Sequence, residues 1–136
     1  MKSISLIQGK YLIGSESIVG DPRRKWEDRV YPPERSHSKV DALNVGEIVR
    51  PDGESLIVGI VADGVGSADF GARGAQLAID TVVQNLRTSR GDDIPTVIEN
   101  AITRANLTVC AENRQHEGDG LSTLVVAVIY KDRCYV

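Results

Sequence analysis

Three carboxylates and one guanidinium are the groups whose types and spacing could carry chemistry in this 136-residue chain: Arg23, Glu27, Asp28 and Asp63. Glu27 and Asp28 are adjacent, so in extended backbone their side chains point to opposite faces. One could bind a metal ion directly while the other orients a metal-bound water. Hard oxygen ligands of this kind suit Mg²⁺ or Mn²⁺ better than Zn²⁺, and neither histidine stands at metal-ligand spacing with a cysteine.

Asp63 ends an apolar run, residues 56–62, that is rich in β-branched side chains. Such a run predicts a strand buried on both faces. A rigid strand that ends in a carboxylate beside the loop 64–67 could hold a metal ion, with Asp63 as the ligand. Two other interpretations stay open, because an Asp-Gly pair is common in turns and the charged segment 23–29 is typical of a solvated surface.

The elements around these residues follow from periodicity and from turn residues. Residues 3–7 and 11–17 are predicted to form a hairpin, residues 32–39 a surface loop, and residues 40–49 to include a strand ended by the turn 51–53. Helices are predicted over 69–86, with Ser67 or Asp69 as the cap, and from near Pro95 to about 114. A strand over 121–130, a tight turn and a last strand from Cys134 complete the chain.

Each predicted helix has one apolar stripe that should face the core. The strands followed by paired helices and further strands favour an α+β fold with helices stacked on a sheet. Cys110, within the second helix, is expected in the core. The stripes comprise Ala75, Ile79, Val82 or Val83, and Leu86 in the first helix, and Ile98, Ala101, Ile102, Ala105 and Val109 in the second.

Composition limits the classes of function. A net charge of −3 and a pI near 5.4 give no basic face for nucleic acid. No apolar run is long enough for a membrane span, and the first ten residues lack the apolar core of a signal peptide. Cys110 and Cys134 form no CxxC pair and are expected to be free thiols, so we expect a cytoplasmic protein without a membrane or nucleic-acid partner.

Three segments together resemble the metal-dependent type 2C protein serine/threonine phosphatases. The segment 20–29, with Arg23 five residues before Asp28, is similar to that family's first motif. Residues 61–66, with Asp63-Gly64 at a strand end, resemble the second motif, and Gly71 also fits. Residues 120–123, Gly-Leu-Ser-Thr, are similar to a Gly-Ser-Thr signature with one residue interposed. The order of the motifs and the helix pair between them agree with the family.

The resemblance implies a partial α-β-β-α sandwich, with antiparallel sheets and a packed helix pair, and a two-metal site for Mg²⁺ or Mn²⁺. Asp63 would bridge the two ions, and Glu27 and the backbone carbonyl of Gly64 would complete one coordination shell. Asp28 would hydrogen-bond metal-bound water. Arg23 would bind the substrate phosphate, which a guanidinium matches with two parallel hydrogen bonds.

The chain departs from the family chiefly in length, because the family's catalytic domain runs much further and its later motifs supply more aspartates. Residues 1–136 are therefore expected to be the N-terminal portion of a type 2C-like domain, truncated after Val136. We expect weak metal binding and poor hydrolysis by this portion alone. Open sheet edges and apolar faces are expected to favour self-association.

Three functions follow from these patterns. The leading one is metal-dependent hydrolysis of phosphoserine and phosphothreonine in signalling phosphoproteins, through a metal-activated water. The alternative is a truncated or pseudophosphatase module that binds a partner without turnover, which the missing later aspartates would favour. The third is an unrelated α+β scaffold, whose stability would not depend on divalent metal.

Overall fold

The computed structural model describes residues 5–7, 10–12, 29–31, 46–66 and 70–136. The described chain is α+β, with two long helices and antiparallel strands, which confirms the predicted fold class. The strands are β1 (Ser5–Ile7), β2 (Lys10–Leu12), β3 (Arg29–Tyr31), β4 (Glu47–Val49), β5 (Ser55–Ala62), β6 (Gly64–Val65), β7 (Leu121–Ser122), β8 (Val125–Tyr130) and β9 (Arg133–Tyr135), and the helices are α1 (Phe70–Thr88) and α2 (Ile94–His116).

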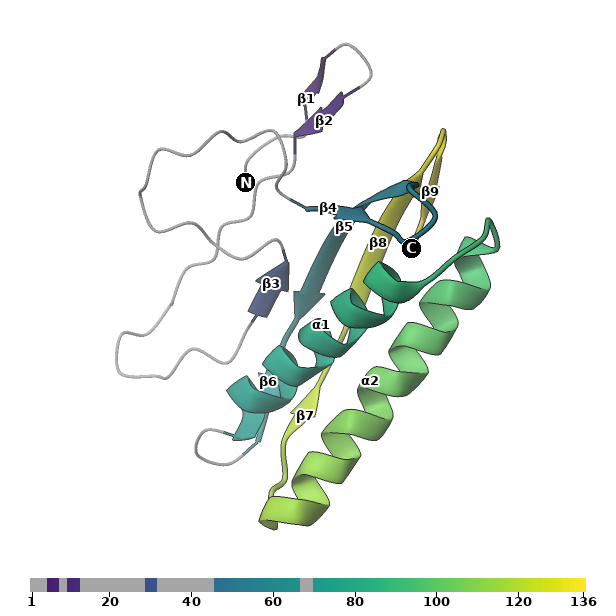
Figure 1. The fold of residues 1–136 in the computed structure, drawn as a ribbon. Helices are drawn as coiled ribbons and strands as arrows, with labels where there is room; N and C mark the ends of the chain where they lie inside the picture. The colour runs from purple at the N-terminus through teal and green to yellow at the C-terminus, as the bar shows by residue number, and fades with distance from the viewer. Residues whose placement is uncertain (1–4, 8–9, 13–28, 32–45, 67–69) are drawn as a thin grey trace.

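β5 is the strand on which the main sheet is built (Figure 1). One edge of β5 pairs with β8, which in turn pairs with β9. The other edge pairs with β4 near the start of β5 and with β3 near its end. All of these pairs are antiparallel. β1 and β2 form the hairpin predicted at the N-terminal end, and β6 and β7 form a small sheet of their own.

The two helices lie side by side and cover one face of the main sheet (Figure 1). α1 packs against α2 and against strands β3 to β7. Alternate residues of β5 and β8 point toward the helices because successive side chains of a strand point to opposite faces. Among the described residues, the buried apolar side chains of the core are Ile48, Leu56, Val58, Ile60, Ala62, Ala75, Ala78, Ile79, Val82, Val83, Leu86, Ile94, Ile98, Ala101, Ala105, Val109, Val126, Val128 and Tyr130.

The prediction that residues 56–62 are buried on both faces is wrong. The residues between the buried ones lie on the other face of the sheet, where Ile57 and Gly59 are half-buried and Val61 is 54% exposed. Val125, the β8 partner of Val61, is 56% exposed on the same face. The described helices cover only one face, so the second face keeps its apolar residues in contact with solvent.

The start of α2 agrees with the predicted proline signal, and Asp93, which was not predicted, supplies its cap. Asp93 caps α2 by accepting a hydrogen bond from the Thr96 N–H (3.3 Å), and Pro95 lies in the first turn, where its missing N–H leaves no hydrogen bond unmade. Gly91, between the helices, has a φ of +80°, which glycine adopts without strain. Neither described helix is both long and apolar enough to cross a membrane.

Two predictions about the second helix are wrong. Ile102 is 40% exposed, although it was assigned to the buried stripe, and Cys110 is exposed rather than in the core. The buried residues of α2 form a single row, and Ile102 lies beside that row; the row comprises Ile94, Ile98, Ala101, Ala105 and Val109. Cys110 and Cys134 are both free thiols, as predicted. The cap residues predicted for the first helix lie outside the described residues.

The predicted strand over residues 121–130 is interrupted. β7 and β8 are separated by Thr123 and Leu124, and β5 and β6 by Asp63. The pairs Val61–Val125 and Gly64–Ser122 nevertheless belong to one antiparallel register. From the first pair to the second, the segment β5–β6 advances by three residues while the segment β7–β8 goes back by three. The two strand pairs are thus one antiparallel ladder with a break, and Asp63 lies at the break.

Candidate functional site

Two of the predicted site residues lie within the described part of the chain. Asp63 is exposed at the end of β5, and Gly64 is buried and begins β6. Arg23, Glu27 and Asp28 lie outside the described residues, so their predicted roles stay predictions.

β3 approaches the end of β5 that carries Asp63. Its first residue, Arg29, pairs with Ala62, the residue before Asp63. Arg29 directly follows Glu27-Asp28 in the sequence. The strand pairing therefore brings the residue after the acidic pair opposite the residue before Asp63, at one end of the sheet.

Thr123 holds the backbone of Asp63 on both sides. The Thr123 N–H donates to the Asp63 carbonyl (2.9 Å), and the Asp63 N–H donates to the Thr123 hydroxyl oxygen Oγ1 (3.3 Å). No described residue forms a hydrogen bond or an ion pair with the Asp63 carboxylate, which is exposed.

The register of the β6–β7 pairing fixes the environment of the Gly64 carbonyl. In an antiparallel ladder, pairs that exchange hydrogen bonds alternate with pairs that exchange none. Because the Thr123 N–H donates to the Asp63 carbonyl, the next pair, Gly64–Ser122, is of the second kind. The β6–β7 ladder therefore does not use the Gly64 carbonyl.

Asn113, in the last turns of α2, anchors the segment that leads into β7. Its side-chain amide donates to the Gly120 carbonyl (2.6 Å) and its side-chain oxygen accepts the Gly120 N–H (3.1 Å). A Cβ on Gly120 would lie only 3.0 Å from the carbonyl carbon of Phe70 and nearer still to its oxygen. A Cβ on Gly66 would lie 3.1 Å from the Gly120 Cα. Glycines thus let the loop after Asp63, the start of α1 and the start of β7 meet at backbone distance.

The described donors suit a hard metal ion. Asp63 offers a carboxylate and Gly64 a backbone carbonyl, and oxygen ligands of both types are those that Mg²⁺ and related ions bind. Within the described ranges, no three His, Cys, Asp or Glu side chains are grouped closely enough to hold a metal ion. The further carboxylate that the sequence analysis assigns to the site, Glu27, lies outside those ranges.

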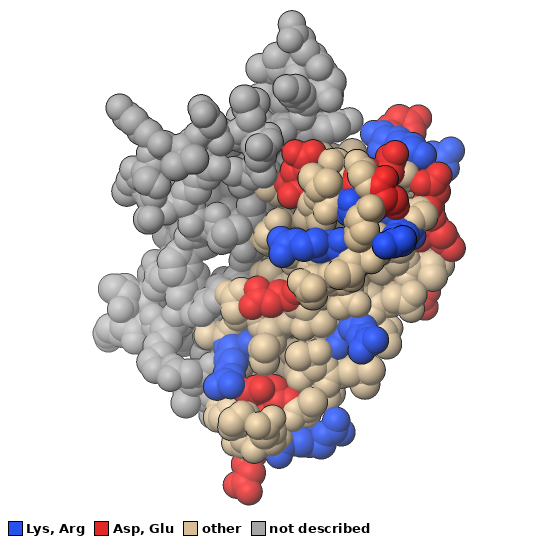
Figure 2. All heavy atoms as spheres, in the orientation of Figure 1, with Lys and Arg blue, Asp and Glu red and all other residues tan. Residues whose placement is uncertain are grey.

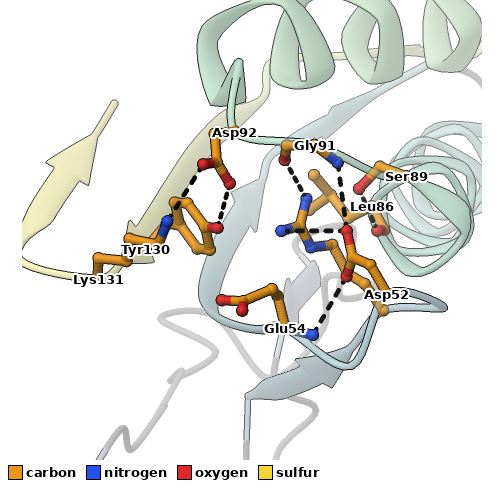
Figure 3. Close-up of polar contacts among 9 residues, drawn as sticks. Asp52, Glu54, Leu86, Ser89, Gly91, Asp92, Tyr130 and Lys131 are labelled. Atoms are coloured by element: carbon orange, nitrogen blue, oxygen red, sulfur yellow. Dashed lines mark hydrogen bonds and ion pairs between the residues drawn. The ribbon is translucent and has the colours of Figure 1, made fainter.

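A second polar cluster lies at the other end of β5 (Figure 3). The side chain of Arg50 is fully buried, donates to the Gly91 carbonyl (2.7 Å) and lies 3.6 Å from Asp52 in an ion pair. Its guanidinium carbon stands 5.0 Å from the centre of the Tyr130 ring, within range of a cation–π interaction. Among the described residues, Arg50 Nε and Nη2 have no hydrogen-bond partner. This cluster joins the turn before β5, the connection between the helices and the end of β8.

The charges in this second cluster compensate one another. The Tyr130 hydroxyl donates to Asp92, and Lys131 lies 3.2 Å from the same carboxylate. The Tyr130 hydrogen bond, followed by Lys131, lowers the pKa of Asp92, and the bond to Asp92 raises the pKa of Tyr130. Each charge has a partner of opposite sign, which indicates a structural role.

The surface charges do not locate a site by themselves. Figure 2 shows acidic and basic side chains interspersed over the described part of one face, with no broad area of a single sign. Arg73 on α1 and His116 on α2 both contact Glu112, which illustrates the same mixing along the helix pair. The break at Asp63 is therefore identified from backbone geometry and donor chemistry rather than from charge density.

Sequence reasoning cited Thr123 as part of a signature but did not predict its contacts with Asp63, and it missed Asn113 and Arg50. Asparagine near a helix end commonly binds nearby backbone, which is a usable signal for Asn113. Nothing in the sequence marks Arg50, since its partner Gly91 is 41 residues away.

The comparison with protein families gives one match over most of the chain. A family described as Protein phosphatase 2C matches residues 35–136. The matched range includes Asp63, Gly64 and Thr123 and begins after the segment that holds Arg23, Glu27 and Asp28. No curated protein matches the chain.

Proposed function

The chain belongs to the protein phosphatase 2C family, and we propose that it hydrolyses phosphoserine and phosphothreonine in phosphoproteins with the help of Mg²⁺ or Mn²⁺. The observation that supports this proposal is the arrangement at the end of β5: the Asp63 carboxylate has no partner among the described residues, and the register of β6 and β7 leaves the Gly64 carbonyl outside their ladder. Two oxygen donors on adjacent residues of a fixed backbone suit a hard divalent ion.

Asp63 and Gly64 would hold the metal, and Glu27 would complete its shell. A divalent ion, when bound, lowers the pKa of a coordinated water and neutralises charge on a phosphoryl group. Asp63 keeps its carboxylate at the end of a rigid strand, so little conformational entropy is lost when it binds. Asp28 would accept a hydrogen bond from water at the site. Arg23 would bind two phosphate oxygens and orient the phosphoester.

The test is Mn²⁺ binding and phosphate release by the chain and by its Asp63→Asn variant. Asparagine keeps the shape of the side chain but removes the negative charge, so we expect Mn²⁺ binding, followed by isothermal titration calorimetry, and hydrolysis of p-nitrophenyl phosphate both to fall in the variant. Asp132→Asn is the matched control, because Asp132 is an exposed aspartate in the β8–β9 turn.

Phosphopeptides distinguish the substrate class. Release of phosphate from phosphoserine and phosphothreonine peptides, but not from a phosphotyrosine peptide, would support the proposed substrates. Equal Mn²⁺ binding by the chain and by Asp63→Asn would refute the role of Asp63. Metal binding that depends on Asp63 without any phosphate release would instead favour a module that binds phosphoproteins without turnover.

A further inference from the structure

Thr123 replaces one backbone hydrogen bond of the ladder with a side-chain bond. In a regular antiparallel ladder of this register, the Asp63 N–H would donate to the Thr123 carbonyl. Here that N–H donates to the Thr123 hydroxyl, and the Thr123 carbonyl accepts the hydroxyl of Ser122 (2.7 Å). The adjacent hydroxyls of Ser122 and Thr123 therefore maintain the break opposite Asp63.

The break lies between two regular ladders that fix its ends. The β5–β8 pairing ends at Val61–Val125, and the β6–β7 pairing begins at Gly64–Ser122. Between these pairs, the two hydrogen bonds of Thr123 restrain the peptide groups before and after Asp63. The orientation of the Asp63 carboxylate relative to the Gly64 carbonyl therefore depends on a contact from the other segment of the ladder.

We propose that Thr123 is a positioning residue for the divalent metal site at Asp63-Gly64, acting through its hydroxyl on the Asp63 N–H. This inference rests on the proposed function, because it assumes that Asp63 and Gly64 bind the metal. In this role Thr123 would act through its contacts with the Asp63 backbone rather than as a ligand of the metal or the phosphate. It holds the two donors in one arrangement before the ion binds, so that less conformational freedom is lost on binding.

Thr123→Val tests this role, because valine has a similar shape, keeps the backbone N–H and removes the hydroxyl. Loss of a group that orients a metal ligand typically weakens metal affinity 10–100-fold. We therefore expect calorimetry to give Mn²⁺ binding at least about tenfold weaker in Thr123→Val. Thr123→Ser restores the hydroxyl and should bind like the parent chain. Thr108→Val is the matched control, since the Thr108 hydroxyl donates within its own helix to the Arg104 carbonyl and has no other partner among the described residues.

Two readouts separate positioning from a general loss of structure. The thermal midpoint in EDTA reports the stability of the metal-free chain, and the increase in that midpoint on adding Mn²⁺ reports affinity. The positioning role predicts a smaller increase in Thr123→Val than in Thr108→Val, compared at equal Mn²⁺ concentration. Amide hydrogen exchange of the metal-free parent should also show protection of the Asp63 N–H, a measurement that needs no variant.

The outcomes distinguish this inference from the proposed function. Mn²⁺ binding that is lost in Asp63→Asn but unchanged in Thr123→Val would overturn the inference alone. An unprotected Asp63 N–H in the parent would overturn it as well, even if Thr123→Val failed to fold. Equal Mn²⁺ binding by the parent and Asp63→Asn would overturn the proposed metal site and, with it, the positioning role.

Discussion

Replacing Arg50 with alanine tests how a buried cation stabilises the end of β5 opposite Asp63. The substitution removes two buried methylene groups, at about 0.8 kcal/mol each. It also removes the hydrogen bond to the Gly91 carbonyl, which is worth about 1.5 kcal/mol at the lower end for a charged donor. The lower end applies because Gly91 is exposed and water can replace the arginine.

One effect opposes these losses. Arg50 Nε and Nη2 are buried without a hydrogen-bond partner among the described residues. Nη2 lies in the ion pair with Asp52 (3.6 Å), so the uncompensated cost falls on Nε, and burying one such group costs about 1 kcal/mol or more. Subtracting this cost from the loss of about 3 kcal/mol leaves a net decrease of about 2 kcal/mol in the free energy of unfolding. With an m-value of about 2 kcal/mol per M, the urea midpoint should fall by about 1 M.

Arg50→Met separates the contribution of the side-chain stem from that of the charge. Methionine retains the apolar stem and removes the unpaired N–H groups, so we expect an unfolding free energy within about 0.5 kcal/mol of the parent. Arg104→Ala, at an exposed position of α2, should also stay within about 0.5 kcal/mol. Urea denaturation followed by circular dichroism measures all three variants. An unchanged midpoint in Arg50→Ala, or a Met variant as unstable as the Ala variant, would refute this reasoning.

Two further predictions concern packing and pH. Gly120→Ala should lower the unfolding free energy by roughly 1–3 kcal/mol, because its Cβ would overlap the Phe70 carbonyl. In the control Gly59→Ala, the new Cβ has no atom within 4 Å and should cause no such overlap. Equal urea midpoints for the two variants would contradict this prediction. The pKa of Asp92 is lowered from its ordinary value of 3.8, so its contribution to stability is present above pH 3.8 and is lost as the pH falls below that value. The pKa of Tyr130 is raised from its ordinary value of 10.0, so its contribution is present below pH 10.0 and is lost as the pH rises beyond that value. Tyr130→Phe removes the hydrogen bond behind both shifts. The urea midpoint of this variant should therefore fall less at acid and at alkaline pH than that of the parent. Profiles of midpoint against pH that superimpose on those of the parent would argue against that bond.

The sequence was sufficient to predict the elements that have strong periodicity. The central strand, both helices and the hairpin at residues 131–133 were predicted within a few residues, because apolar spacing and capping residues act locally. The family and the α+β class are confirmed for the same reason, since ordered motifs placed on correctly predicted elements are specific.

The errors have physical causes that a local pattern does not contain. An apolar run such as residues 56–62 looks the same whether one or both faces are covered, so the exposure of Val61 could not be predicted. Ile102 is exposed because it stands one residue, about 100° around the helix, beyond the buried row that includes Ala101 and Ala105. Arg50 was missed because its burial depends on Gly91 and Tyr130, which are distant in the sequence.

The position of part of the candidate site was predicted, while its chemistry stays a prediction. Asp63 and Gly64 lie at a strand end, as the sequence indicates, and their metal-binding roles belong to the proposal. The break in the ladder could not be predicted, because it depends on which of two acceptors on Thr123 takes the Asp63 N–H. The roles of Arg23, Glu27 and Asp28 are predictions that the described residues do not test.

The ladder break has a consequence for folding kinetics. Asp63 and Thr123 are 60 residues apart in the sequence, and both helices lie between them. Closing so long a loop is slow when the intervening chain is unstructured. The pairing of α1 with α2 folds that chain back on itself and shortens the distance to be closed. The backbone arrangement at Asp63 therefore cannot form as a local unit, and we expect it to form together with the β5–β8 pairing that continues its register.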